Sequence, residues 1–389
     1  MKVSVSFIVR IFFLTALFVL AVGGCYNMRA MEGADEGNIG YLFIIFVYLV
    51  WMSSVLKTFL PNYVVYKPAT PIILYAVFIL WTIFPTMMSG QENMVYNLIF
   101  ITLPGLVLIS TYNTVLNYGY HKWHLALFCL MLGMFTVQYV MVFNFINIFD
   151  DDSGHLAVSY YTLYMLPLVF LCKSKTIRVV ATIVATIVVL SSLKRSGVVA
   201  IVLAIFVYII INQHVKKKLT PTAILSIIGL LLLFATFFIV FGSMGEETVF
   251  ERFENIGNDN GSGRLVVWEM TTKMISRLDV GNLLIGEGYN SVVVNSPVNL
   301  SAHNDFLEVI YDYGLVGLAL YVSAFLSVCY YTVKMIASKS VYAPSMAMLM
   351  VIYLIQSMIS HIIIYYWASL FMLSFGYMIG NYQRDAGNR

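Results

Sequence analysis

The sequence predicts an all-α protein that crosses a membrane about twelve times. The chain has 389 residues, of which 60% are hydrophobic and only 11% are charged, and its mean hydropathy is +0.86. A soluble domain carries about 25% charged residues. The spacing of the apolar runs and the distribution of charge between them support the same fold class.

Each helix needs roughly 20 apolar residues to cross a hydrocarbon core of about 30 Å. Twelve runs of suitable length occur, at 6–24, 39–56, 70–88, 94–112, 124–148, 156–172, 176–193, 197–212, 221–241, 304–333, 342–360 and 362–381. They form a single membrane domain over 1–389. Very short joints separate the seventh run from the eighth and the eleventh from the twelfth, so eleven or thirteen helices are alternatives.

The charged residues between the runs set the orientation, because cytoplasmic loops carry an excess of Lys and Arg. With the N-terminus in the cytoplasm, fifteen of the 22 basic residues lie on the cytoplasmic side, among them the triple lysine at 216–218. Of the 19 acidic residues, only Asp385 does. We therefore expect both termini in the cytoplasm. The basic residues left outside are Arg29, Lys194, Arg195, Arg252, Arg264, Lys273 and Arg277.

The same alternation places a long polar loop, 242–303, outside the membrane between the ninth and tenth predicted helices. A turn cluster at 258–263 precedes apolar residues at helical spacing over 264–278. That spacing predicts an amphipathic helix at the membrane surface. The Gly-rich stretch 281–289 is turn-like. A loop of this length is usually functional or disordered.

Several function classes are disfavoured by the composition. There is no basic nucleic-acid patch, and no two histidines have metal-ligand spacing, so we expect no bound metal. His121, His124, His155, His214 and His361 map to joints on both sides of the membrane and form no cluster with His303. The four cysteines, Cys25, Cys129, Cys172 and Cys329, are interpreted as small apolar residues, although residues 22–25 also resemble a lipoprotein cleavage box.

The outer cations are the first candidates for chemistry. Lys194 and Arg195 lie in a short joint, where they either snorkel to lipid headgroups or bind an anion. Ser196 and Gly197 follow, and the free N–H groups at a helix start favour negative charge. Arg264 either is a solvated charge on its helix or makes a second phosphate contact.

His303 is the candidate general base, since an imidazole accepts a proton near neutral pH. It is equally a structural hydrogen-bonding residue, and Asn304 a helix cap. Three carboxylates follow on one helix face, and charges inside a spanning helix usually face a cavity or a partner. They are Asp305, Glu308 and Asp312, of which Asp312 is expected to pair with an arginine or to orient His303.

Four motifs together resemble the O-antigen ligase and O-antigen polymerase superfamily. They are Ser-Leu-Lys-Arg-Ser-Gly at 192–197, Gly-Ser-Gly-Arg-Leu-Val-Val-Trp at 261–268, Gly-Glu-Gly-Tyr-Asn at 286–290 and Ala-His-Asn-Asp-Phe-Leu-Glu-Val-Ile-Tyr-Asp-Tyr-Gly-Leu-Val-Gly at 302–317. The likeness is sharpest over 180–320. Lys194 departs from the pattern, because the family more often has a small or polar residue there.

The resemblance implies a metal-independent inverting glycosyltransferase of the bacterial inner membrane, without cofactors, that acts at the periplasmic face. Its donor would be a glycan on undecaprenyl diphosphate. The acceptor would be a sugar hydroxyl on another lipid-linked repeat (polymerase) or on lipid A–core (ligase). Arg195 and Arg264 would hold the diphosphate, His303 would activate the acceptor, and an apolar, Tyr- and Phe-rich cavity would admit the polyprenyl chain. Lys194, Ser196, Asn304, Asp305, Glu308 and Asp312 would assist in binding.

We favour the polymerase, with the ligase as the nearest alternative. Membrane lipids and a protein that regulates chain length are expected partners. A lipid-linked glycan flippase, or another transporter, would predict charges spread through both halves of the membrane domain, whereas the first five predicted helices contain almost none. A structural partner in a polysaccharide assembly complex would not need Arg195, Arg264 and His303 together.

Overall fold

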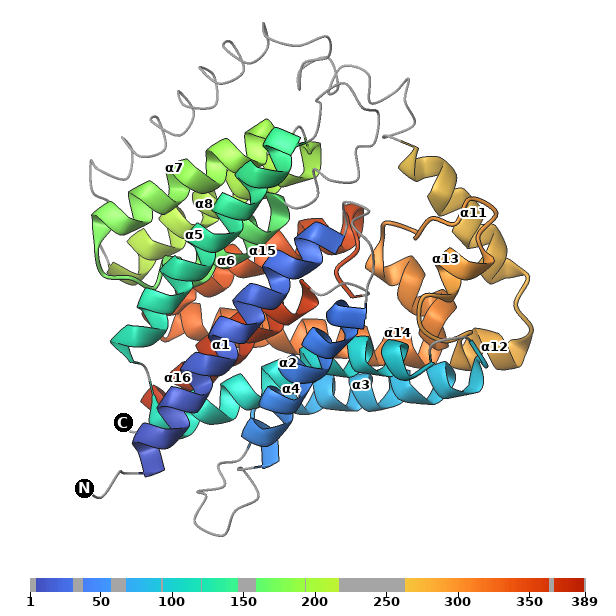
Figure 1. The fold of residues 1–389 in the computed structure, drawn as a ribbon, viewed down its shortest axis with the longest axis horizontal. Coiled ribbons are helices and arrows are strands. Elements are labelled where there is room, and N and C mark those ends of the chain that lie inside the picture. The colour runs from blue at the N-terminus through green and yellow to red at the C-terminus, as the bar shows by residue number, and fades with distance from the viewer. Residues whose placement is uncertain are drawn as a thin grey trace, which may run out of the picture.

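All elements in the part of the protein that the structure describes are helices (Figure 1). The computed structural model describes residues 5–30, 38–56, 68–91, 94–119, 121–145, 159–192, 194–216, 263–363 and 367–387. Within these ranges there are fourteen helices: α1 (Val5–Ala30), α2 (Asn38–Leu56), α3 (Thr70–Met88), α4 (Met94–Tyr118), α5 (Lys122–Phe145), α6 (Tyr160–Val169), α7 (Lys175–Ser191), α8 (Arg195–Lys216), α11 (Arg264–Ser276), α12 (Val280–Ile285), α13 (Ser291–Asn295), α14 (Asp305–Ala337), α15 (Ala343–Ile359) and α16 (Ala368–Gly387).

The predicted apolar runs correspond closely to these helices. Eleven of the twelve coincide with α1 to α8 and α14 to α16. The ninth run, 221–241, the turn cluster at 258–262 and His155 lie outside the described residues. Five described helices, α3, α4, α5, α8 and α14, are long and apolar enough to span a membrane, and three shorter apolar segments lie in α1, α2 and α15. The protein is therefore a polytopic membrane protein.

Long helices pack side by side to form the body of the molecule. The principal pairs are α4 with α16, α8 with α15 and α3 with α14. Gly376 makes the first of these contacts close, because a Cβ atom there would lie 2.7 Å from the carbonyl oxygen of Leu108. Small residues allow helix backbones to approach in this way within membranes. The core is rich in fully buried aromatic side chains, including Trp51, Tyr164 and Trp367.

The helix α14 is kinked, although its sequence predicts one continuous run. Gly314 has φ 69° and ψ −176°, a conformation that only glycine adopts readily. A kink releases carbonyl groups from the helix ladder, and buried ones need other donors. Those of Tyr311, Asp312 and Tyr313 accept hydrogen bonds from Glu287 N at 3.0 Å, Gly288 N at 2.8 Å and Trp81 Nε1 at 2.9 Å, respectively.

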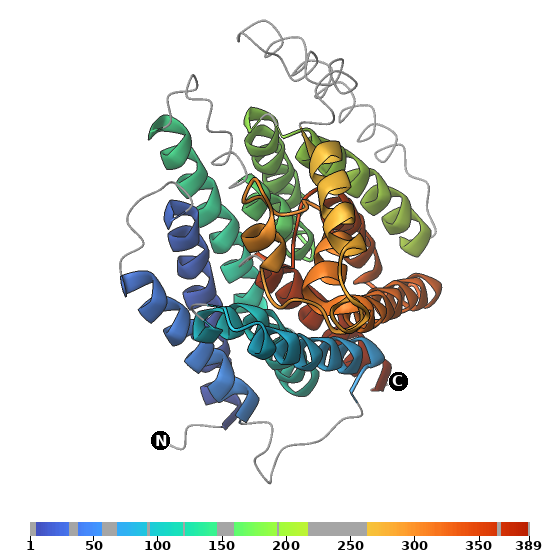
Figure 2. The ribbon, with the colours of Figure 1, turned by 90° about the vertical axis from the view of Figure 1, so that its right-hand side faces the viewer.

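The segment before α14 is described from residue 263 onwards. The predicted helix begins at Arg264 as expected, and α11 packs against α14. The stretch 281–289 is not turn-like throughout, because α12 occupies Val280–Ile285. The Asp279 side chain starts it by accepting from Gly281 N and Asn282 N. Figure 2 shows α11 and α13 beside the first half of α14.

Candidate functional site

His303 lies immediately before α14, where the segment that contains α11 to α13 joins that helix. Its neighbour Asn304 caps the helix, since the Asn304 Oδ1 atom accepts hydrogen bonds from Phe306 N at 3.0 Å and Leu307 N at 3.2 Å. His303 has φ 50°, in the left-handed region that non-glycine residues seldom adopt. Strained conformations of this kind cluster at functional sites. The helix cap and the backbone conformation therefore fix the position from which the His303 side chain extends.

Two of the predicted cations lie within electrostatic range of this imidazole. Burial, and then the charges of Arg264 and Lys194, lower the pKa of His303 from its ordinary value to about 4. Each effect disfavours the protonated ring. His303 is therefore neutral at physiological pH and can accept a proton. Lys194 and Arg264 are 70 residues apart in the chain, so the fold brings them together.

Arg195 is the first residue of α8 and is partly buried. The next residue, Ser196, is buried and its Oγ atom lies 2.6 Å from the hydroxyl of Tyr160. That hydroxyl is also within electrostatic range of Arg264. Tyr160, the first residue of α6, thus links the beginning of α8 to the beginning of α11. Nothing in the sequence around Tyr160 indicated this position.

His361 is the functional neighbour that the sequence analysis missed. The prediction that the other histidines form no cluster with His303 is wrong, because the His361 and His303 rings are stacked with centroids 4.6 Å apart and planes 26° apart. His361 follows the end of α15 and lies 58 residues from His303. The Nδ1 atom of His361 lies 2.7 Å from the Oγ atom of Ser301, and both side chains are buried.

The three carboxylates of α14 are fully buried and accept hydrogen bonds from backbone N–H groups. The Asp312 side chain accepts from Asn290 N at 2.9 Å and Val292 N at 3.1 Å, at the start of α13. It thus neither pairs with an arginine nor contacts His303 in the hydrogen bonds of the described residues. The Asp305 side chain accepts hydrogen bonds from Ile362 N at 2.7 Å and Ile363 N at 3.2 Å. The Glu308 side chain accepts one from Ala302 N at 2.8 Å.

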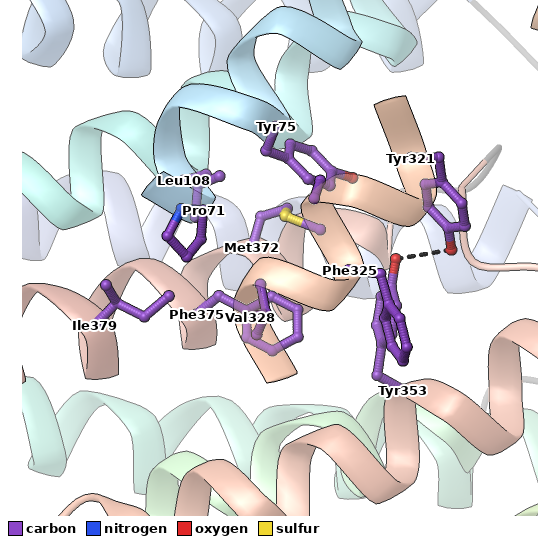
Figure 3. A pocket seen from close by; sticks show the side chains of 11 residues that line it. Pro71, Tyr75, Leu108, Tyr321, Phe325, Val328, Tyr353, Met372, Phe375 and Ile379 are labelled. Atoms are coloured by element: carbon purple, nitrogen blue, oxygen red, sulfur yellow. Dashed lines mark hydrogen bonds between the residues drawn. The ribbon is translucent and has the colours of Figure 1, made fainter. Parts of the chain in front are cut away.

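A small apolar pocket lies between the helices near Asp305, which contacts one of its lining residues, Tyr321 (Figure 3). The Asp305 Oδ2 atom accepts a hydrogen bond from the Tyr321 hydroxyl at 3.1 Å, and that hydroxyl lies 2.9 Å from the Tyr353 hydroxyl. The cavity is bounded by α3, α4, α14, α15 and α16. Its lining consists of Pro71, Tyr75, Leu108, Tyr321, Ala324, Phe325, Val328, Tyr353, Met372, Phe375 and Ile379.

Cofactor ligands do not gather in the described part of the chain. No group of three or more His, Cys, Asp or Glu side chains there has the geometry to hold a metal ion. All four cysteines are free, and the nearest pair, Cys129 and Cys172, has its sulfur atoms 3.8 Å apart. The described residues of the site include a neutral imidazole within electrostatic range of two cations, with a second imidazole stacked on it.

Comparison with known families agrees with the motifs. Residues 180–322 match a family model described as O-antigen ligase. The resemblance drawn from the sequence is thus confirmed, and the chain carries an O-antigen ligase domain over these residues. No curated protein matches the chain. The matched segment contains Lys194, Arg195, Arg264 and His303, but it ends before α15 and His361.

Proposed function

We propose that this membrane enzyme of the O-antigen ligase and polymerase type is a polysaccharide polymerase. It transfers a glycan from undecaprenyl diphosphate to a sugar hydroxyl of a second lipid-linked repeat at the periplasmic face. The observation that carries the proposal is the convergence of Lys194 and Arg264 on a neutral His303. A cationic pair beside a neutral base suits a reaction with an anionic leaving group and a hydroxyl nucleophile.

The cations would bind the diphosphate of the donor. Arg195 and Arg264 offer planar guanidinium groups that can bind phosphate oxygens in pairs. Lys194 adds a charge within electrostatic range of His303. As the glycosidic bond breaks, the electron pair goes to the phosphate oxygen, and the cations stabilise the charge that develops there. No nucleotide is needed, because the donor is already activated.

His303 would act on the acceptor. Its neutral ring takes the proton as the acceptor oxygen bonds to the anomeric carbon, and attack opposite the departing diphosphate inverts that carbon. Donor binding should also help the base, since the diphosphate charge offsets those of Arg264 and Lys194, which keep the pKa of His303 low. The imidazolium then returns its proton to solvent or to the released diphosphate.

The lipid portion of the donor would lie toward the membrane. The apolar pocket near Asp305 has a Tyr- and Phe-rich lining, which has the chemical character that a polyprenyl chain requires. Backbone N–H groups already donate hydrogen bonds to the carboxylates of Asp305, Glu308 and Asp312. Asn304 caps α14. We therefore assign these four residues a structural role, which is to hold the site in place. Ser196 has the same role through Tyr160.

The topology that accompanies this function is a single membrane domain of twelve spanning helices with both termini in the cytoplasm. The loop 242–303 then faces the periplasm, with α11 at the membrane surface as a lid over the site. The segregation of charge in the sequence supports this arrangement. It places Lys194, Arg264 and His303 on the face where lipid-linked repeats are joined.

A glycan gel of a deletion strain tests the proposal. Loss of a polymerase leaves a single repeat on lipid A–core. Loss of a ligase leaves no repeat there, while long chains accumulate on undecaprenyl diphosphate. Arg195→Ala, Arg264→Ala and His303→Ala should each insert normally and yet fail to restore long chains. Normal chains in all three variants would contradict the catalytic assignment, and the ligase pattern would replace the polymerase with its nearest alternative.

A further inference from the structure

Residues 360–363, which follow α15, are held by the beginning of α14 on one side and by Trp367 on the other. Asp305, at the start of α14, accepts hydrogen bonds from Ile362 N and Ile363 N at 2.7 and 3.2 Å. On the other side, Trp367 Nε1 donates to the carbonyl oxygen of His361 at 3.0 Å. Both contacts are buried. The backbone on either side of His361 is consequently fixed relative to the beginning of α14.

The ring of His361 is fixed as firmly as its backbone. Ser301 Oγ lies 2.7 Å from its Nδ1 atom. The Trp367 ring lies nearly parallel to the His361 ring, with planes 15° apart and centroids 6.3 Å apart. Only 6% of His361 and 3% of Ser301 are exposed. The His303 ring is stacked on this imidazole at 4.6 Å.

From this arrangement we propose that His361, held by Ser301, is a positioning residue for His303. The buried ring is a platform that fixes the plane of the His303 imidazole and hence the direction in which its free nitrogen meets the acceptor hydroxyl. A general base must lie within hydrogen-bond reach of the proton that it takes. The inference rests on the proposed function, and it extends the site beyond residues 180–322, where the O-antigen ligase domain ends.

The charge of the platform suits this role. Burial, followed by the charges of His303, Arg264 and Lys194, lowers the pKa of His361 well below its ordinary value, so the ring stays neutral. The carboxylate of Glu308 accepts a hydrogen bond from the N–H group of Ala302, the residue after Ser301, at 2.8 Å. When His303 takes up a proton, it meets the face of an uncharged ring, which attracts a cation. A second imidazolium at 4.6 Å would repel it.

Four variants of the purified protein test the proposal, each assayed for glycan transfer from a lipid-linked repeat. His361→Ala removes the platform, and we expect kcat to fall by roughly 100-fold with the donor KM unchanged, the effect of misplacing a reacting group by about 1 Å. His361→Phe keeps a flat ring and should stay within about 5-fold of wild type. Ser301→Ala frees the ring and should lie between the two. His303→Ala should be inactive.

A pH profile separates positioning from a general structural defect. Burial is the largest cause of the low pKa of His303. His361→Ala admits water to the ring, so the acid limb of the rate profile should move to higher pH, whereas in His361→Phe it should not. Thermal unfolding of each variant in detergent shows which are folded, and His121→Ala, in a distant joint, is the matched histidine control.

Two results would contradict the proposal that the His361 ring positions His303. One is a wild-type kcat in His361→Ala, and the other is an equal loss in His361→Phe and His361→Ala, which would assign the role to imidazole chemistry instead of stacking. If His361→Ala does not fold, the comparison of His361→Phe and Ser301→Ala with wild type decides in the same way. Undiminished transfer by His303→Ala would instead contradict the proposed function itself.

Discussion

The proton affinity of His303 is set by its surroundings more than by the residue itself. Burial is the first cause of its low pKa, and the charges of Arg264 and Lys194 add to it. Only the neutral ring can act as a base, so wild-type transfer should persist down to about pH 4, the pKa of His303. In the proposed mechanism the two cations therefore stabilise the leaving group and also keep the base neutral.

Removing either cation should shift the acid limb of the pH–rate profile. In Arg264→Gln the imidazolium of His303 is less disfavoured, so its pKa rises toward 6.5 and transfer is lost at a higher pH than in wild type. We also expect kcat to fall by about 10²–10³, as on removal of one stabilising group for an anion. Lys194→Gln should shift the limb in the same direction by less. The dependence of kcat/KM on pH measures both shifts.

Lys273→Gln is the matched control for these variants. Lys273 lies on α11 with Arg264, but its side chain is exposed and pairs with Glu269 at 2.6 Å. Its loss should leave the acid limb and kcat unchanged. If the limb of Arg264→Gln stays at the wild-type position, the electrostatic contact between Arg264 and His303 does not operate in solution.

Two substitutions of Asn304 distinguish a role in helix capping from a role in substrate binding. Its Oδ1 atom holds the first turn of α14, and loss of such a cap costs about 1 kcal/mol. Asn304→Ala should therefore lower the stability of the protein by at least that amount. Asn304→Asp keeps the accepting oxygen and loses only the bond from Nδ2 to the Met358 carbonyl oxygen at 3.2 Å, so it should lower the stability less and preserve transfer. Denaturation in detergent and the transfer assay give the two readouts. An inactive but stable Asn304→Asp would favour a substrate contact through the amide.

Among the elements, α14 connects the outer segment to the membrane body through its kink. Gly314 is essential to that geometry, because a Cβ atom there would lie 2.2 Å from the carbonyl oxygen of Leu284. The sequence analysis treated 304–333 as one run, since hydrophobic periodicity does not register a single residue with a positive φ. Gly286, Gly288 and Gly314 lie in one contact between the segment 284–288 and the kink of α14. Because the two segments are far apart in the chain, the sequence does not reveal this contact.

Gly314→Ala should destabilise the protein by about 1–3 kcal/mol, the cost of a strained backbone position, and displace α12 from α14. Gly133→Ala is the matched control, because a Cβ atom added in α5 at that position meets nothing within 4 Å. Thermal unfolding of the two variants in the same detergent gives the difference. Equal stability of both would contradict the described packing of the kink.

For the whole molecule, the sequence was informative wherever a local pattern determines the structure. Apolar runs located eleven of the twelve predicted helices among the described elements, because each helix buries its own backbone groups. Arg264 and His303 stood out as polar residues at the ends of such runs. Contacts between distant segments could not be predicted, since the 57 residues between His303 and His361 give no sign of their stacking, and Tyr160 is one of 27 tyrosines.

The orientation in the membrane is a prediction for the whole molecule, and cysteine labelling tests it. In a variant without the four native cysteines, Lys273→Cys should react with a membrane-impermeant maleimide added to spheroplasts. Lys339→Cys, in the joint between α14 and α15, should react only after the membrane is opened. The reverse pattern would place His303 in the cytoplasm, on the wrong side for lipid-linked repeats.

The central claim is that Arg264, Lys194 and His303 together join glycan repeats without further components. The most direct measurement combines the purified protein, in lipid vesicles, with a lipid-linked repeat unit and follows both products. We predict a ladder of longer glycans with one undecaprenyl diphosphate released for each bond formed, and neither product from His303→Ala. Chain growth by His303→Ala at the wild-type rate would contradict the account, as would the absence of any chain growth by the wild-type protein.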